Sequence, residues 1–135
     1  MIILTNSTSL TLGPGQTCTF DTILLKTKGA ECYRQGSGSV QLIAPNAIYK
    51  IAAGGNIGAT AIGDANLTVF LNGSPMPETS MNSATAAVGN VNNVFRETAV
   101  RTCCCPNVSE IVTLANNGET TIVLENPILM IGRVA

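Results

Sequence analysis

The residues most able to do chemistry in this chain are its cysteines, three of which are consecutive. The chain has no histidine, and its five cysteines are Cys18, Cys32, Cys103, Cys104 and Cys105. On a strand, side chains alternate between the two faces, so Cys103 and Cys105 share one face while Cys104 points to the other. Zinc sites usually combine Cys-x2-Cys pairs into four ligands, a spacing that this sequence lacks.

Three roles stay open for these cysteines. We favour small, buried, apolar residues at the end of a strand that Pro106 terminates. The second role is a disulfide between Cys18 or Cys32 and a member of the triplet, although such bonds are rare in a reducing cytoplasm. The third is a metal bound at the axis of an oligomer. None of the three indicates an enzyme.

Other catalytic arrangements are not apparent in the sequence. The eight carboxylates are scattered along the chain, and no spacing brings two of them together for acid and base catalysis. Without histidine, a serine or cysteine nucleophile lacks its usual base. We therefore expect no enzymatic activity and no cofactor.

The charge and length exclude several further classes. Seven basic and eight acidic residues give 135 residues a net charge of -1, so no broad positive field favours nucleic acid. The apolar runs are far too short to span a membrane. Charged residues make up 11% of the chain, against about 25% in ordinary domains, which suits a surface that packs against copies or partners.

Alternating apolar and polar residues between turn signals predict an all-β, single-domain chain. The turn signals include Asn72-Gly73 and Asn117-Gly118, whose residues tolerate the positive φ of tight hairpins. The predicted strands are 2–5, 19–26, 40–43, 47–52, 67–71, 91–101, 110–114, 120–124 and 128–134. So many short strands favour an antiparallel two-sheet jelly-roll sandwich, with an immunoglobulin-type sandwich as the alternative. The absence of tryptophan and the cysteine spacing weaken that alternative.

Five stretches carry a resemblance to small phage and prophage proteins that are similar to short forms of the tumour-necrosis-factor-like jelly roll. They read FDTILLKTKG (20–29), GSGSVQL (36–42), LTVFLNGSPMPETSM (67–81), VNNVFRETAVRTCCC (91–105) and NPILMIGRVA (126–135). The resemblance covers roughly residues 18–135, which we take as the jelly-roll domain. Residues 1–17 then form an N-terminal arm with a first strand. The resemblance implies a homotrimer on a virion.

Two functions follow from that resemblance. The first is a trimeric capsid decoration or head-fibre protein, assembled in the bacterial cytoplasm and bound to the major capsid protein or another virion protein. The second is a receptor-binding trimer that recognises a host surface glycan through its apical loops. The candidate apical loop is Asn72, Gly73, Ser74 and Pro75, and the candidate trimer-interface residues are Tyr49, Phe95, Met130 and Arg133.

Overall fold

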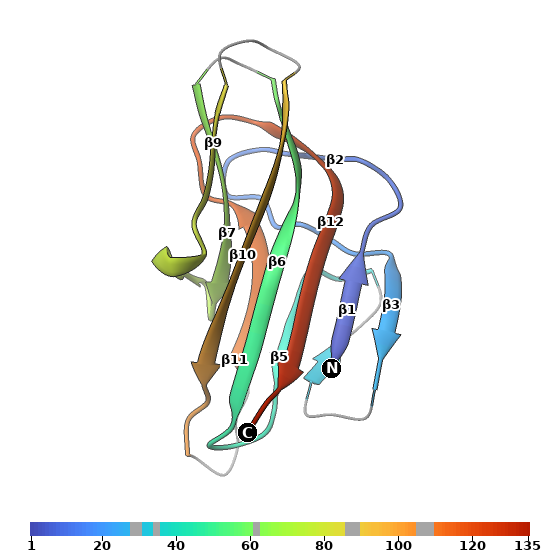
Figure 1. Cartoon of the computed structure of the whole chain (residues 1–135), viewed down its shortest axis with the longest axis vertical. Coiled ribbons are helices and arrows are strands. Elements are labelled where there is room, and N and C mark those ends of the chain that lie inside the picture. Colours follow the sequence, from blue (N-terminus) through green and yellow to red (C-terminus); the bar gives the residue numbers. More distant parts are fainter. Residues whose placement is uncertain (28–30, 34–35, 61–62, 86–89, 105–109) are drawn as a thin grey trace.

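The computed structural model describes residues 1–27, 31–33, 36–60, 63–85, 90–104 and 110–135 (Figure 1). These residues form strands joined by turns and one short 3-10 helix. In chain order the elements are β1 (Ile2–Thr5), β2 (Leu10–Leu12), β3 (Thr22–Lys26), β4 (Glu31–Tyr33), β5 (Val40–Leu42), β6 (Ile48–Ala59), β7 (Gly63–Leu71), β8 (Ser74–Pro75), η1 (Pro77–Thr79), β9 (Met81–Thr85), β10 (Val91–Arg101), β11 (Glu110–Asn116) and β12 (Ile122–Arg133).

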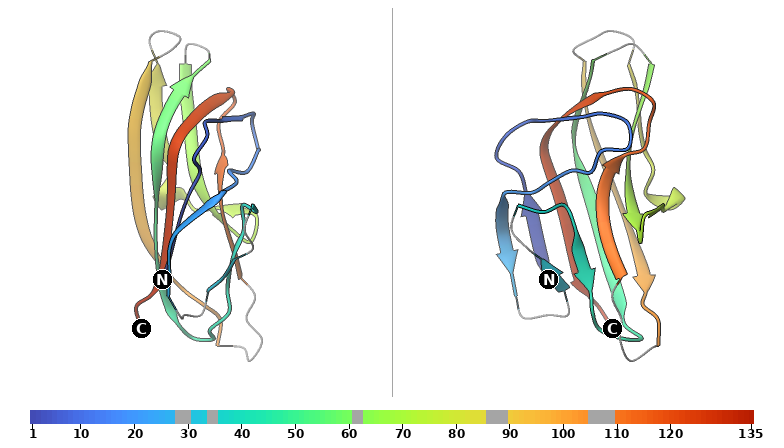
Figure 2. Two further views of the ribbon diagram at one scale, coloured as in Figure 1. Left: turned by 90° about the vertical axis from the view of Figure 1, so that its right-hand side faces the viewer. Right: turned by 180° about the vertical axis from the view of Figure 1, so that it is seen from behind.

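The strands form two sheets that pack face to face. Sheet A has the order β10-β6-β12-β1-β3, with β2 also paired to β12. Sheet B has the order β4-β5-β11-β7-β8, with β9 also paired to β7. Every pairing is antiparallel, and Figure 2 shows the two layers from the side and from behind. The predicted all-β two-sheet sandwich is confirmed.

The core lies between the sheets and is built by alternating strand residues. In β12, for example, Leu129 and Ile131 are fully buried while the intervening Met130 is only partly covered. Period-two alternation turns every second side chain inward, and burial of large apolar side chains is the main stabilising term. The largest fully buried side chains are Tyr49, Phe20, Ile2, Leu4, Leu42, Ile51, Ile57, Leu67, Leu114, Ile122, Leu124 and Leu129.

Strand β12 joins two segments that the sequence pattern separates, 120–124 and 128–134. The register of β12 against β6 shifts between Glu125 and Ile128, and Asn126 has a φ of 50°. A bulge tolerates proline because it interrupts the hydrogen-bond ladder, which explains how Pro127 is accommodated. The Asn-Pro pair therefore bends one long strand and does not end it.

Strand β6 is also longer than the pattern predicts, because it continues through a glycine-rich stretch. A Cβ atom on Gly54 would lie 2.4 Å from the carbonyl oxygen of Val94, and one on Gly55 would lie 2.9 Å from Leu124 Cδ1. Glycine within a strand marks such close approaches. The glycines therefore let β6 sit tightly between β10 and β12 within one protomer.

The N-terminal segment is part of the sandwich. Strand β1 lies between β12 and β3, and β2 pairs with β12. Ile2 and Leu4 are buried in the core, and Thr17 bridges to Ala115 of sheet B. Residues 1–17 are thus not a free arm, because releasing them would expose core side chains. Among the described residues, no helix has the length and apolar character needed to cross a bilayer.

Candidate subunit interface on the outer face of sheet A

The outer face of sheet A carries rows of apolar and small residues across its strands. The register places Phe95 opposite Gly54 and Glu97 opposite Ala52, in β10 and β6. On the other side of β6, Ala52 lies opposite Met130 of β12. The rows continue across the sheet through Ile3 and Leu25, because Met130 lies opposite Ile3 and Ile3 opposite Leu25.

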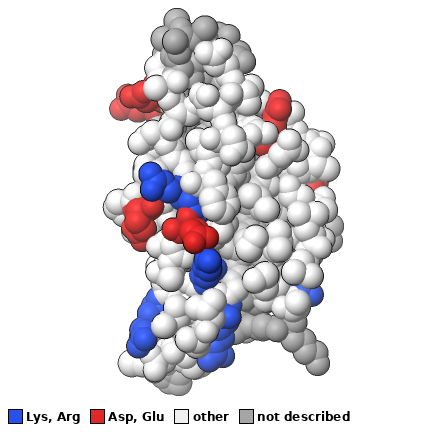
Figure 3. Space-filling view, viewed as in Figure 1, with Lys and Arg blue, Asp and Glu red and all other residues white. Residues whose placement is uncertain are grey.

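This face leaves large apolar side chains in contact with solvent. Phe95 is 54% exposed, and Met1 and Leu25 are each 43% exposed. Figure 3 views this face, where the surface over β12 and β1 is largely free of charged side chains. Exposed apolar patches on soluble proteins often mark contacts with another molecule.

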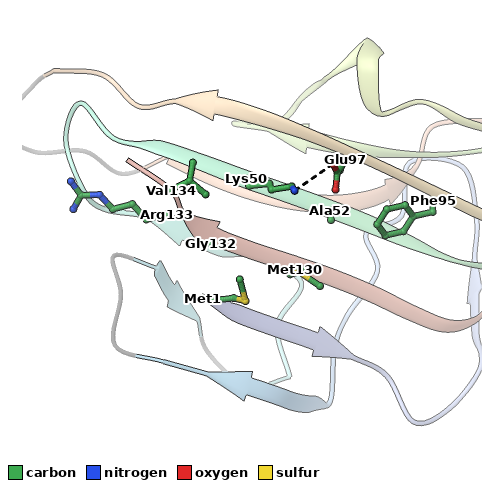
Figure 4. A pocket seen from close by; sticks show the side chains of 9 residues that line it. All are labelled: Met1, Lys50, Ala52, Phe95, Glu97, Met130, Gly132, Arg133 and Val134. Carbon is green, nitrogen blue, oxygen red and sulfur yellow. Dashed lines mark ion pairs between the residues drawn. The ribbon is translucent and has the colours of Figure 1, made fainter.

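A hollow of about 220 Å³ lies on this face, near the start of β6 and the end of β12 (Figure 4). Its walls come from the N-terminus and from β6, β10 and β12, which the sheet brings side by side. The residues that line it are Met1, Lys50, Ala52, Phe95, Glu97, Met130, Gly132, Arg133 and Val134. Ala52 and Gly132 form a low floor because neither has a side chain beyond Cβ.

One ion pair stands in this hollow. The Lys50 Nζ atom lies 3.4 Å from Glu97 Oε1, and the two side chains are 56% and 52% exposed. They are diagonal neighbours, because Lys50 lies opposite Ala99 while Glu97 lies opposite Ala52. With this exposure, solvent screens the attraction, so the pair contributes roughly 0–1 kcal/mol in the isolated chain.

Three of the four predicted interface residues line this hollow, namely Phe95, Met130 and Arg133. Tyr49 does not, because its side chain is fully buried between the sheets. Its hydroxyl oxygen accepts a hydrogen bond from the Ala44 amide at 3.3 Å. Tyr49 therefore belongs to the protomer core, since its strand position turns it inward.

Arg133, at the end of β12, is at the surface. Its Nε atom donates a hydrogen bond to the Ala135 carbonyl oxygen at 3.1 Å, and the side chain is exposed. The other residues that line the hollow were not among the predicted interface residues, and Lys50 and Ala52 of β6 are two of them. The alternation of Lys50, Ala52 and Gly54 along β6 was the signal, since these residues share one face.

The predicted apical loop lies on sheet B, away from this hollow. Asn72 and Gly73 both have positive φ, 53° and 82°, and form the tight turn between β7 and β8. The Asn72 side-chain oxygen accepts a hydrogen bond from the Ile111 amide at 2.9 Å, which fixes the turn to β11. The exposed Ser74 and Pro75 follow in β8.

The cysteines do not form one cluster among the described side chains. Cys18 is a buried free thiol whose pKa is raised to about 12 by burial, because the thiolate would lose its hydration. Cys104 is an exposed free thiol, and Cys103 is disulfide-bonded. The Cys32 side chain and Cys105 lie outside the described residues. Within the described part of the chain, no group of three or more Cys, Asp or Glu side chains is placed to hold a metal.

The comparisons with known proteins agree on the architecture. No protein-family model matches the sequence, and no curated protein matches it. Among solved structures, the chain is similar to an Eiger TNF from S. frugiperda, with a TM-score of 0.76, 7% identity and coverage of 99% of this chain and 91% of that one. It is also similar to the PRD1 vertex protein P5, with a TM-score of 0.58, 13% identity and coverage of 99% and 96%.

At these identities the similarity concerns the fold alone. The chain is an all-β, tumour-necrosis-factor-like jelly roll that is similar in fold to the PRD1 vertex protein P5. The resemblance noted from the sequence is therefore confirmed for the fold.

Proposed function

We propose that this chain is a non-enzymatic structural protein of a bacteriophage virion, which closes into a homotrimer and decorates the capsid surface. The observation that carries the proposal is the solvent-exposed apolar face of sheet A, on which Phe95 of the edge strand β10 is more than half exposed. A tumour-necrosis-factor-like fold is often trimeric, and a vertex protein of a phage has a similar fold.

The face offers a physical reason to associate. Covering roughly 300 Å² of apolar surface in each copy would contribute about 7 kcal/mol before the costs of ordering are subtracted. A ring of three copies buries this face in every subunit, whereas in an isolated chain the face is exposed to solvent. Closed rings of identical subunits are a common outcome of such contacts.

Docking on the capsid must use a surface other than the N-terminal segment, because β1 and β2 are already paired within sheet A. The outer surface of sheet B and the ends of the sandwich remain available in such a ring. The partner in this proposal is the major capsid protein or another virion protein.

The proposal is tested in two steps with the purified chain. Light scattering coupled to size exclusion should give three times the mass of the 13.9 kDa chain. Addition to capsid particles that lack the protein should then saturate at a fixed number of trimers per particle. A protein that stays monomeric, or a trimer that never adds to capsids, contradicts the trimer and the decoration role respectively.

A second candidate function is recognition of a host glycan. It is favoured by a hollow of about 240 Å³ between β9 and β10, whose lining includes Ser80, Asn82, Asn93 and Arg96. Hydroxyl, amide and guanidinium groups of this kind can pair with sugar hydroxyls. Binding to host cells or to immobilised host glycans by the isolated protein, lost in Asn82→Ala and Asn93→Ala, would support this function over decoration.

A further inference from the structure

The apolar part of the outer face of sheet A, taken alone, does not fix the position of a second copy that packs against it. Ala52, Gly54 and Gly132 contribute no side chain beyond Cβ to this face, so it has little relief where they lie. A smooth apolar surface attracts without direction, because the hydrophobic effect is non-directional. Such a surface alone would let a second copy settle in several orientations of similar free energy.

The Lys50–Glu97 ion pair is a charged feature on this otherwise apolar part of the face. It is the ion pair within the hollow, and it stands among Phe95, Met130 and Ala52. Figure 4 shows the two side chains directed toward each other above the floor of the hollow. The other charged residue of the hollow, Arg133, is an exposed side chain that bonds to the chain terminus.

Covering the face with a second copy changes the environment of this pair. Both side chains are more than half exposed in the single chain, so water completes their hydrogen bonding. A covering subunit removes that water. A desolvated ion pair adds little net stability, but it is costly wherever its remaining donors and acceptors meet only apolar groups. Packing arrangements that leave the pair unsatisfied are therefore disfavoured.

We infer that the Lys50–Glu97 pair sets the register in which copies of this chain pack against the outer face of sheet A. This inference rests on the trimer proposed above, and its partner is a second copy of the same chain. The apolar residues supply the attraction, and the pair selects one arrangement among the many that they permit. Single polar groups in apolar interfaces are known to select register and oligomeric state in this way.

The test compares the wild-type chain with three variants. Glu97→Gln leaves the lysine without its counter-charge, whereas Lys50→Met with Glu97→Leu replaces the whole pair by apolar side chains of similar size. Glu119→Gln is the matched control, because it removes one exposed carboxylate from the turn that precedes β12. Both side chains of the pair are solvated in the single chain, so the variants should fold. Circular dichroism of diluted samples checks this.

Two measurements report on the register. Native mass spectrometry gives the number of copies over a dilution series, and electron paramagnetic resonance gives the distances between nitroxides on the exposed Cys104 thiol. Glu97→Gln should raise the midpoint concentration of assembly at least tenfold, and Glu119→Gln should leave it unchanged. The double variant should assemble at or below the wild-type concentration, but with several stoichiometries or a broadened distance distribution.

The outcomes separate this inference from the proposed function. A wild-type chain that stays monomeric at all concentrations overturns the trimer and the register role together. A uniform wild-type trimer whose double variant keeps one stoichiometry and the same narrow distances overturns the register role alone. Loss of assembly in Glu119→Gln to the same extent as in Glu97→Gln would also overturn it, because the effect would then follow net charge.

Discussion

Truncating Phe95 should weaken the trimer strongly while leaving the protomer folded. Phe95 is 54% exposed, so about 110 Å² of a side chain of about 200 Å² is free to be covered by a second copy. At about 25 cal/mol per Å², covering it stabilises each contact by about 2.7 kcal/mol. Alanine retains a small part of this stabilisation, so we expect Phe95→Ala to reduce the free energy of association by about 2 kcal/mol per copy.

Three copies then lose about 6 kcal/mol, which is about a 10⁴-fold change in the monomer–trimer constant. Because the midpoint concentration varies as the square root of that constant, it should rise about 100-fold. Mass photometry or sedimentation equilibrium over a dilution series measures this midpoint. The urea midpoint of the dissociated protomer should change little, since the side chain is largely outside the core.

The matched control is Ile111→Ala, which removes a 37% exposed apolar side chain from β11 of sheet B. It should leave the assembly midpoint at the wild-type value. The reasoning is refuted if Phe95→Ala assembles within threefold of the wild-type concentration, or if Ile111→Ala weakens assembly equally.

Three further predictions concern the protomer. Gly54→Ala should lower the free energy of unfolding by about 1–3 kcal/mol in urea titrations because its Cβ meets backbone at 2.4 Å, whereas Gly58→Ala, with 3.6 Å of space, should be close to neutral. Hydrogen bonds from a serine and a threonine lower the pKa of Asp21, so its stabilising contribution is present above the usual aspartate pKa and is lost as the pH falls through the lowered value. Asp21→Asn should accordingly be less stable at pH 7, and the difference should vanish in acid; an equal difference at pH 2 would contradict this. Burial should protect Cys18 from iodoacetamide at pH 8 while Cys104 reacts, as peptide mapping of native protein would reveal, and equal labelling would show that Cys18 is accessible.

Local alternation along the chain was enough to predict several strands. The bounds of β1 and β10 agree with the predicted ranges 2–5 and 91–101. The pattern failed where backbone geometry is exceptional. Asn126 adopts a positive φ at a bulge, so β12 continues through a pair of residues typical of a turn.

The short strands β2, β4, β8 and β9 were also missed, or read as parts of loops. β2, β4 and β8 have only two or three residues, too few alternating positions to be recognised, and the five residues of β9 are polar or small with the exception of Met81. All four strands exist because a neighbouring strand offers hydrogen-bond partners. β8, for example, is held by its pairing with the end of β7. Their existence therefore depends on tertiary structure.

The candidate interface residues show the same difference between what the sequence predicts and what the tertiary structure decides. The aromatic and apolar character of Phe95, Met130 and Tyr49 is visible in the sequence, and all three suit either a core or an interface. Only the packing of the two sheets decides that Tyr49 turns inward while Phe95 and Met130 line an outer hollow. A strand has two faces, and its own sequence does not state which of them another sheet will cover.

The sequence by itself determined the class of the fold and the scarcity of charge, because these follow from residue types and their period along one strand. The tertiary structure alone decided which distant residues meet, such as Lys50 of β6 with Glu97 of β10. That meeting depends on the register between strands far apart in the chain. Register is fixed by the burial of a whole face and not by any local preference.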